Sequence, residues 1–246
     1  MDTSISTRIA SDRADQTRAR ILEAAAHQFS LNGLAGARTE QIAEAAGVNK
    51  ALLYYYFKGK EALYAAALES VFEEVLTTSI AVLEADASAG ERFLQIVLSH
   101  FDRSYSRPTL RTLMQQEMVR LHRGEENRMA HIAEKFFRPM WFKVQELLEE
   151  GIASGELIQV DAAQIRYASL GANVFYFLTA PLNRLAFGTD PLEPEELAHR
   201  RKAATEFLGQ AIFTDRKCGA QIAARVLAST PMPESNENLT NHVRHK

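Results

Sequence analysis

Lysine and tyrosine side chains gather in one short stretch of the sequence, residues 47–64, which reads GVNKALLYYYFKGKEALY. On a helix, Leu53 and Phe57 are four residues apart and turn inward together. Lys50 and Tyr54 then share an exposed face, and residues 49–60 include three lysines and no acidic residue. The whole chain has a formal net charge of -3, so this stretch is a basic surface on an otherwise acidic protein. Local basic surfaces of this kind bind phosphates.

The chemistry expected of this surface is recognition of double-stranded DNA. An ammonium near the start of a helix, as at Lys50, can donate to guanine O6 or N7 in the major groove, and the small side chain of Ala51 leaves room for a base or a thymine methyl. The alternative is an ordinary solvated helix face, which rarely carries neighbouring tyrosines. The residues predicted to contact DNA are Arg18, Arg38, Thr39, Lys50, Ala51, Tyr54, Tyr55 and Lys60.

Two short helices joined by a glycine turn are expected to position these side chains. Thr39 is predicted to cap a helix over residues 40–46, Gly47 to end it, and Asn49 to cap the helix that follows. This arrangement is typical of a helix-turn-helix, in which the second helix of the pair enters the major groove.

The rest of the chain is expected to be helical as well, since glycine and proline are sparse and apolar residues recur at intervals of three and four. The first helix is predicted to begin near Asp15 and to end at Gly33, and Pro139 to kink or restart a later one. The fold class is therefore all-α. The predicted parts are a flexible arm (1–14), a helix-turn-helix DNA-binding domain (15–60), an effector-binding and dimerisation domain (61–215) and a C-terminal extension that is disordered at its end (216–246).

The phrase TEQIAEAAGVNKALLYYYFKGKEAL closely resembles the TetR family of transcriptional regulators. The resemblance is strongest over residues 15–64. It implies DNA-contacting roles for the positions occupied by Thr39, Lys50, Ala51, Tyr54, Tyr55 and Lys60. Two positions depart from the family pattern: Leu52 replaces a small hydroxyl residue that bonds a phosphate, and Tyr56 replaces a frequent histidine. The family's usual mode implies a homodimeric repressor that a small-molecule effector releases from operator DNA.

In the C-terminal part the resemblance extends only to the helical layout. It implies that helices over residues 161–187 and 194–213 pair with their mates in a dimer. Their predicted apolar faces are Leu170, Val174, Phe177 and Leu178 on the first, and Ala203, Ala204, Phe207, Leu208 and Ala211 on the second.

The helices between Glu61 and Gly155 would then enclose the effector pocket, with a hydrophobic or aromatic effector as the hypothesis. Each candidate side chain is also of a type that any helical core contains. The candidates for effector contact are Phe101, Met114, Met118, Trp141, Phe142 and Phe175, with Phe137 and Tyr176 beside them and His100, Arg103 and Glu117 as polar anchors.

Other classes of function find less support in the residues. No catalytic residue, metal site or cofactor is predicted, because His122 and His131 lack a third ligand, the His242 and His245 pair lies in the tail, and Cys218 has no base partner. A helical-bundle enzyme would need a polar constellation buried between the long helices. A DNA-binding protein that answers to another protein is a third hypothesis.

The compartment expected from the sequence is the cytoplasm. The polar N-terminal residues show no signal peptide, and no apolar stretch is long enough to span a bilayer, so no membrane partner is expected. A single cysteine suits a reducing compartment.

Overall fold

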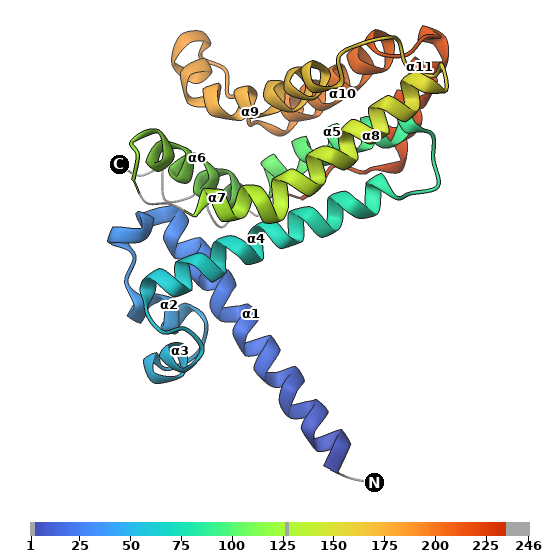
Figure 1. Ribbon diagram of the computed structural model, residues 1–246. Helices are drawn as coiled ribbons and strands as arrows, with labels where there is room; N and C mark the ends of the chain where they lie inside the picture. The colour runs from blue at the N-terminus through green and yellow to red at the C-terminus, as the bar shows by residue number, and fades with distance from the viewer. Residues whose placement is uncertain (1–2, 126–127, 235–246) are drawn as a thin grey trace. The chain divides into compact units, whose positions relative to one another are not determined.

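The computed structural model describes residues 3–125 and 128–234 and places most of them in helices (Figure 1). Within these ranges, no helix offers an apolar stretch sufficient to cross a lipid bilayer. The all-α fold class predicted from the sequence is confirmed. In chain order the helices are α1 (Thr3–Gly36), α2 (Thr39–Ala45), α3 (Lys50–Tyr56), α4 (Lys60–Leu83), α5 (Ala89–Ser106), α6 (Pro108–His122), α7 (Met129–Ile132), the π-helix η1 (Ala133–Phe137), α8 (Arg138–Ala153), α9 (Ala162–Phe187), α10 (Pro194–Ala211) and α11 (Arg216–Ser229).

The chain divides into two compact units that interleave along the sequence. The first comprises the residues up to Val75 together with Thr109–Phe136, and the second comprises Leu76–Pro108 together with the residues from Phe137 on. The boundary expected after Lys60 therefore lies inside the first unit. Helix α6 clusters with the N-terminal helices, so a part of the chain expected in the effector domain packs with the predicted DNA-binding helices.

In the first unit, α1 is the helix on which α2 packs (Figure 1). Ile21 and Phe29 on α1 are fully buried, as is Ile42 on α2. Helix α1 begins at Thr3 rather than near Asp15, because the segment expected as an arm contains neither glycine nor proline to interrupt it. Gly33 takes the left-handed φ of 65° and kinks α1 at the predicted position.

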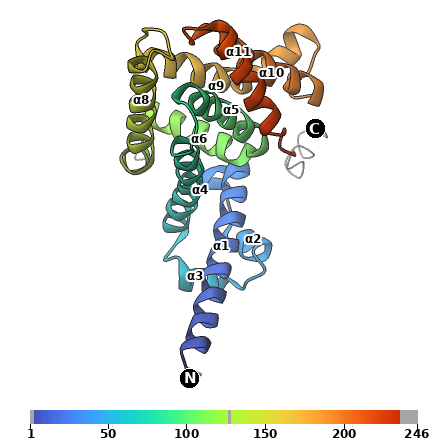
Figure 2. The same ribbon diagram turned by 90° about the vertical axis from the view of Figure 1, so that its right-hand side faces the viewer.

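In the second unit, α5 is the central helix and contacts α8, α9, α10 and α11. Figure 2 shows α5 between α8 on one side and α10 on the other. Phe93, Leu94 and Leu98 on α5 are buried in the main apolar cluster of this unit, where Leu148 of α8 and Val226 of α11 meet them. Ser88 is the N-cap of α5, since its hydroxyl accepts from the amide of Glu91.

The long helix expected to pass Pro139 changes its winding before that residue, since α7, the π-helix η1 and α8 follow one another without a gap. Pro139 is the second residue of α8, directly after the π-helical turn. Pro181, by contrast, lies inside α9, which continues to Phe187.

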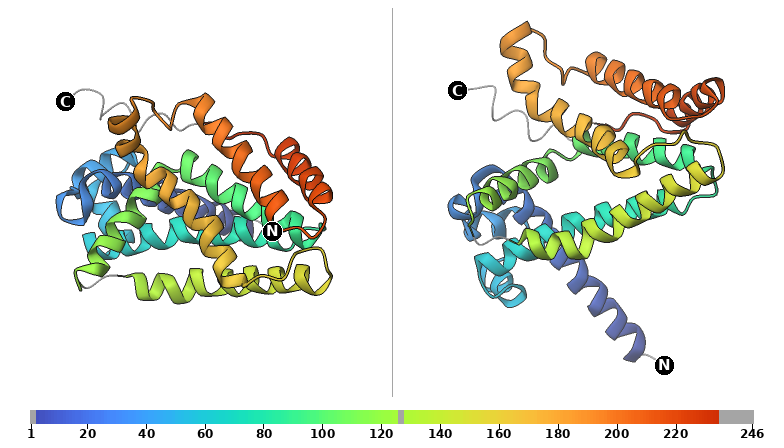
Figure 3. Two further views of the ribbon diagram at one scale, coloured as in Figure 1. Left: turned by 90° about the horizontal axis from the view of Figure 1, so that it is seen from above. Right: turned by 45° about the horizontal axis from the view of Figure 1, so that its top comes forward.

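Helix α11 lies in the segment expected from the sequence to be a C-terminal extension, for which no helix was predicted. It packs beside α10 (Figure 3) at a close approach of Gly209 and Gly219. A β-carbon added to Gly209 would lie 2.6 Å from the Gly219 carbonyl oxygen. The carboxylate of Asp215 caps α11 by accepting from the amides of Lys217 and Cys218. The predicted disorder at the end of the chain concerns residues 235–246, which lie outside the described residues.

Candidate nucleic-acid interface

Helices α2 and α3 are held at a fixed angle by buried side chains and a glycine turn. Leu53 and Phe57 of α3 are buried, and so is Ile42 of α2. Gly47 has a φ of 64°, which side chains other than glycine rarely adopt, and this turns the chain between the helices. The side chain of Asn49 accepts from the amide of Leu52, 2.8 Å away, and caps α3 as predicted.

Polar side chains of α2 and α3 form one connected network on the exposed side of this pair. The hydroxyls of Thr39 and Tyr54 are hydrogen-bonded at 3.2 Å. The ammonium of Lys50 lies 5.7 Å from the centre of the Tyr54 ring and forms an ion pair with the carboxylate of Glu40. The bond to Lys50 lowers the pKa of Glu40, and Glu40 in turn raises the pKa of Lys50, so both groups are charged at neutral pH.

Thr39 does not cap α2, and that prediction is wrong. It is the first residue of α2, and Arg38 occupies the N-cap position without a side-chain hydrogen bond. The Thr39 side chain is buried and bonded to Tyr54. Thr39 therefore fixes α3 on α2, and its hydroxyl is already engaged.

Two further residues of α3, Ala51 and Tyr55, lie open to solvent. Tyr55 is 80% exposed, and Ala51 beside it is exposed as well. Tyr56 occupies the position often taken by histidine and donates its hydroxyl to the carbonyl of Ala14 at 3.3 Å. An aromatic side chain as exposed as Tyr55 contributes nothing to the core, which favours a role in binding.

Three further cationic residues that were predicted from the sequence to contact DNA lie outside this hydrogen-bonded network. Lys60 donates at 2.9 Å to the carbonyls of both Ala35 and Ala37, so its ammonium holds the start of α4 against the end of α1. The guanidinium of Arg18 lies 5.6 Å from the centre of the Phe57 ring, and Arg38 is exposed before α2. Lys60 thus has a structural role that the sequence did not reveal.

Two models of known protein families match the chain, and one of them covers this surface. A model of the bacterial regulatory proteins of the tetR family matches residues 21–67, which include the whole of α2 and α3. A model of the tetracyclin repressor-like C-terminal domain matches residues 89–208. The chain belongs to the TetR family. It is a transcriptional regulator of the helix-turn-helix type.

Individual TetR-family proteins resemble the chain over most of its length. The HTH-type transcriptional repressor NicS of Pseudomonas putida is 29% identical over 181 residues, which are 73% of this chain and 84% of that protein. A regulator from Saccharomonospora viridis, solved with choline, has the same fold with a TM-score of 0.66 and 16% identity, covering 82% of this chain and 100% of that one. The regulator FadR of Bacillus subtilis, solved with stearoyl-CoA, gives a TM-score of 0.59 and 21% identity, covering 77% of this chain and 96% of that one.

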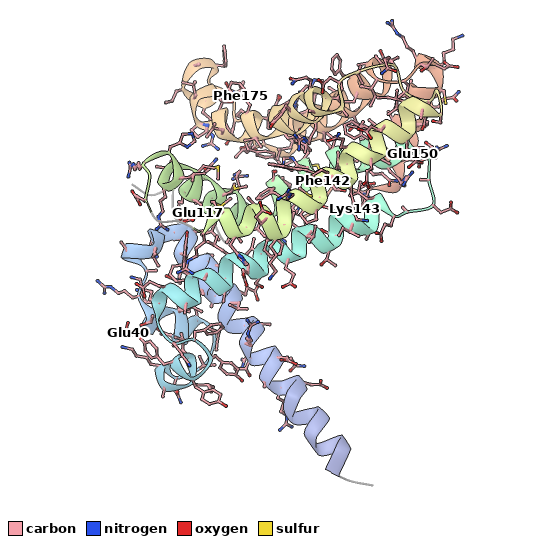
Figure 4. The ribbon with its side chains drawn as sticks, in the orientation of Figure 1. Glu40, Glu117, Phe142, Lys143, Glu150 and Phe175 are labelled. Carbon is pink, nitrogen blue, oxygen red and sulfur yellow. The ribbon has the colours of Figure 1, made fainter. Side chains whose placement is uncertain are left out.

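The candidates for effector contact are distributed over both units of the TetR-family chain. Met114 and Met118 are on α6 in the first unit, and the other four are in the second. Phe101 is buried against Phe177, with 5.1 Å between the ring centres, and is a core residue. Phe142 on α8 and Phe175 on α9 are exposed (Figure 4). Trp141 on α8 is also exposed, and the guanidinium of Arg166 lies 4.6 Å from the centre of its ring.

The predicted polar anchors already have partners within the protein. Glu117 is fully buried and accepts from the hydroxyl of Tyr64 at 2.7 Å and from Arg120 at 2.8 Å. Arg103 donates to the hydroxyls of Thr78 and Ser79. These two charged groups stabilise the fold in this structure.

His100, the third predicted anchor, lies beside Asn173, whose amide nitrogen is 3.4 Å from its ring. Burial lowers the pKa of His100 to about 4, and the nearby guanidinium of Arg103 acts in the same direction. His100 is therefore neutral at physiological pH.

A stripe of apolar side chains lies exposed along α9. Together with Gly171, whose surroundings are open, its members recur at intervals of three and four. The apolar face predicted for α9 is divided between two sides of the helix, because Phe177 is buried and Leu170 packs on the core. On α10, Leu208 packs on the core while Phe207 is exposed. The α9 stripe consists of Tyr167, Val174, Leu178, Leu182 and Leu185.

Proposed function

We propose that this TetR-family chain is a homodimeric cytoplasmic repressor that binds operator DNA through α3 and leaves it when a small molecule binds the second unit. The observation that supports DNA contact most directly is the exposed face of α3. Lys50, Ala51 and Tyr55 project from a helix that Leu53 anchors in the core. A recognition helix needs this division between a buried face and an open face with donors for bases and phosphates.

The α9 stripe supports the dimer. Single exposed apolar residues are common on protein surfaces, but a continuous row of them marks an interaction site. Leu185 is 86% exposed and Leu182 is 62% exposed in the single chain. A second copy that meets the same stripe on α9 would bury these side chains in an isologous interface.

An effector bound in the second unit is supported by similar proteins, since the related regulators from S. viridis and B. subtilis were solved with choline and with stearoyl-CoA. We propose a hydrophobic or aromatic effector for this chain. Trp141 and Phe142 of α8 and Phe175 of α9 are the most accessible of the predicted contacts. A ligand that covers them would gain apolar burial without first opening the core.

The mechanism we propose is a shift between two conformations of the dimer. In one, the two α3 helices are about one DNA turn apart, roughly 34 Å, and fit successive major grooves. The effector binds the other conformation more tightly and so lowers the population that fits the operator. Helix α4 links these events, because it begins at Lys60, close to α3 in sequence, and continues past Val75 into the second unit.

The test of DNA binding is retention of DNA fragments from around the protein's own coding region at several salt concentrations. We expect sequence-selective binding that Lys50→Ala weakens and makes less selective, and that Tyr54→Phe weakens on every sequence by removing only the hydroxyl. The matched control is Lys217→Ala, which removes an exposed charge from α11. Equal affinity of both variants and the control would contradict the assignment of α3.

The effector is tested next on the operator complex. Stearoyl-CoA and choline, the compounds bound by the two similar proteins, are titrated separately into wild type and into Phe175→Ala. Release by the acyl compound, weakened in the variant, is expected of a hydrophobic effector site. Release by small charged compounds alone would contradict the hydrophobic effector, and a selective dimer that no small molecule releases would favour control by another protein.

A further inference from the structure

The recognition helix carries its main cation in contact with a carboxylate from the neighbouring helix. Lys50 of α3 and Glu40 of α2 form an ion pair whose side chains are about half exposed, 49% and 63% (Figure 4 labels Glu40). An exposed ion pair of this kind contributes little to stability. The fold therefore does not depend on this ion pair, which leaves the Glu40 carboxylate available to what the surface binds.

A carboxylate on a DNA-binding surface is costly unless a base uses it. Phosphates repel it, and every phosphate contact of Lys50 would have to compete with Glu40. In the major groove, however, the amino groups of cytosine N4 and adenine N6 are hydrogen-bond donors, and a carboxylate accepts from them. The groove floor is thus the part of DNA that a carboxylate beside Lys50 can contact favourably.

The pair presents a donor directly beside an acceptor, which is the complement of one base-pair edge. A G·C pair shows the keto oxygen O6 of guanine next to the amino group N4 of cytosine. We propose that Glu40 and Lys50 together read a single base pair, with Lys50 donating to the keto oxygen and Glu40 accepting from the amino group. This inference rests on the proposed DNA-binding function and assigns Glu40 as a specificity-determining residue within it.

The neighbouring contacts hold both side chains of the pair in place. The ring of Tyr54 lies against the Lys50 ammonium, and the hydroxyl of Thr39 lies 3.5 Å from the Glu40 carboxylate. Since Thr39 and Tyr54 are bonded to each other, the four residues form a closed set. The donor and acceptor are therefore presented in a fixed order rather than as two mobile charges.

The fixed order predicts a preference for orientation as well as for composition. A G·C pair is favoured over T·A, because guanine N7 offers Lys50 a second acceptor. The inverted C·G pair would place the keto oxygen against the carboxylate and the amino group against the ammonium. We therefore expect one position in each half-site at which inversion of G·C weakens wild-type binding by about tenfold or more.

The experiment first selects the operator half-site of the full-length wild-type dimer from a random duplex pool. The affinity of wild type, Glu40→Gln and Glu23→Gln is then measured for every single base-pair substitution at one salt concentration. Glu23→Gln removes the same charge from an exposed position on α1. Glutamine can both donate and accept, so in Glu40→Gln we expect the inversion penalty at one position to fall to within about threefold, with the other positions unchanged. Non-specific binding is expected to tighten, because one negative charge has left the surface.

Two results would overturn the assignment while the proposed function stands. One is a base-preference profile of Glu40→Gln that equals the wild-type profile at every position. The other is a uniform loss of affinity over all sequences, which a merely structural role of Glu40 would produce. Failure of the wild type to select any sequence would instead contradict the DNA-binding function itself, and this inference with it.

Discussion

Removal of the Arg201 guanidinium is expected to destabilise the second unit strongly. Its Nε and Nη2 atoms donate to the two carboxylate oxygens of Asp102 at 2.7 and 2.8 Å, and Nη2 also donates to the carbonyl of Thr230 at 2.7 Å. Arg201 is 7% exposed and Asp102 is 8% exposed. Because α5 carries Asp102 and Thr230 follows α11, the substitution Arg201→Met disconnects three segments at once.

The size of the effect follows from the fate of the Asp102 carboxyl. Burial already raises its pKa although Arg201 acts in the opposite direction. Without the guanidinium we expect this carboxyl to become protonated in the folded state. For a group with an ordinary pKa of 3.8, protonation at pH 7 costs about 4 kcal/mol, within the roughly 3–5 kcal/mol typical of a broken buried ion pair.

Protonation of Asp102 makes the stability of the variant depend on pH. The folded variant holds a proton on Asp102 that the unfolded chain releases above pH 3.8, so the stability of the variant relative to wild type rises as the pH falls. We expect the penalty at pH 5 to be smaller by about 2.7 kcal/mol than the penalty at pH 7. A constant penalty would indicate lost packing rather than an uncompensated charge.

The assay is urea unfolding followed by circular dichroism at one fixed protomer concentration. The matched control is Lys143→Met, which breaks an exposed ion pair with Glu84 in the same unit and is expected to change stability little. The double variant Asp102→Leu/Arg201→Met removes both charges and is expected to recover most of the loss. The reasoning is refuted if Arg201→Met costs no more than the control, or if the double variant is as unstable as the single one.

Two further predictions concern other buried polar groups. Lowering the pH from 7 to 5 is expected to destabilise the fold by about 1–2 kcal/mol through His100, whose folded pKa of about 4 lies below its ordinary value of 6.5. The reason is that the unfolded chain binds a proton that the folded chain does not. In denaturant titrations at both pH values, His100→Gln is expected to remove this difference, and an unchanged difference would contradict the burial of a neutral imidazole. Tyr64→Phe is expected to cost about 1.5–3 kcal/mol in the same assay, because it removes a 2.7 Å hydrogen bond to the buried carboxylate of Glu117; a loss below about 0.5 kcal/mol would show that this link between α4 and α6 is not a stabilising one.

Much of the predicted interface rested on local rules and followed from neighbouring residues. Asn49 caps α3, Gly47 turns the chain, and Leu53 faces the core as its spacing indicated. The sequence missed Glu40, since nothing in the order of the residues shows that position 40 meets position 50. That contact depends on the angle between two helices, which side chains far apart in the chain determine.

The sequence could not show which of the predicted effector-contacting residues are accessible to a ligand. Aromatic and methionine residues have the same spacing in a core as in a binding site, so the sequence could not separate Phe101, which is buried against Phe177, from Phe175, which is exposed. Nor could it assign α6 to the first unit, because that grouping depends on contacts such as the bond from Gln116 to the Ser30 carbonyl.

The sequence by itself determined the helical fold, the helix-turn-helix and the family, because periodicity, caps and the glycine turn act over a few residues. Only the tertiary structure decided which charges meet: Lys50 with Glu40, Lys60 with the carbonyls at the end of α1, and Arg201 with Asp102. The reason is physical. A charged side chain takes the partner that the packing of distant helices brings within reach, and that packing is the sum of many weak apolar contacts that no short segment encodes.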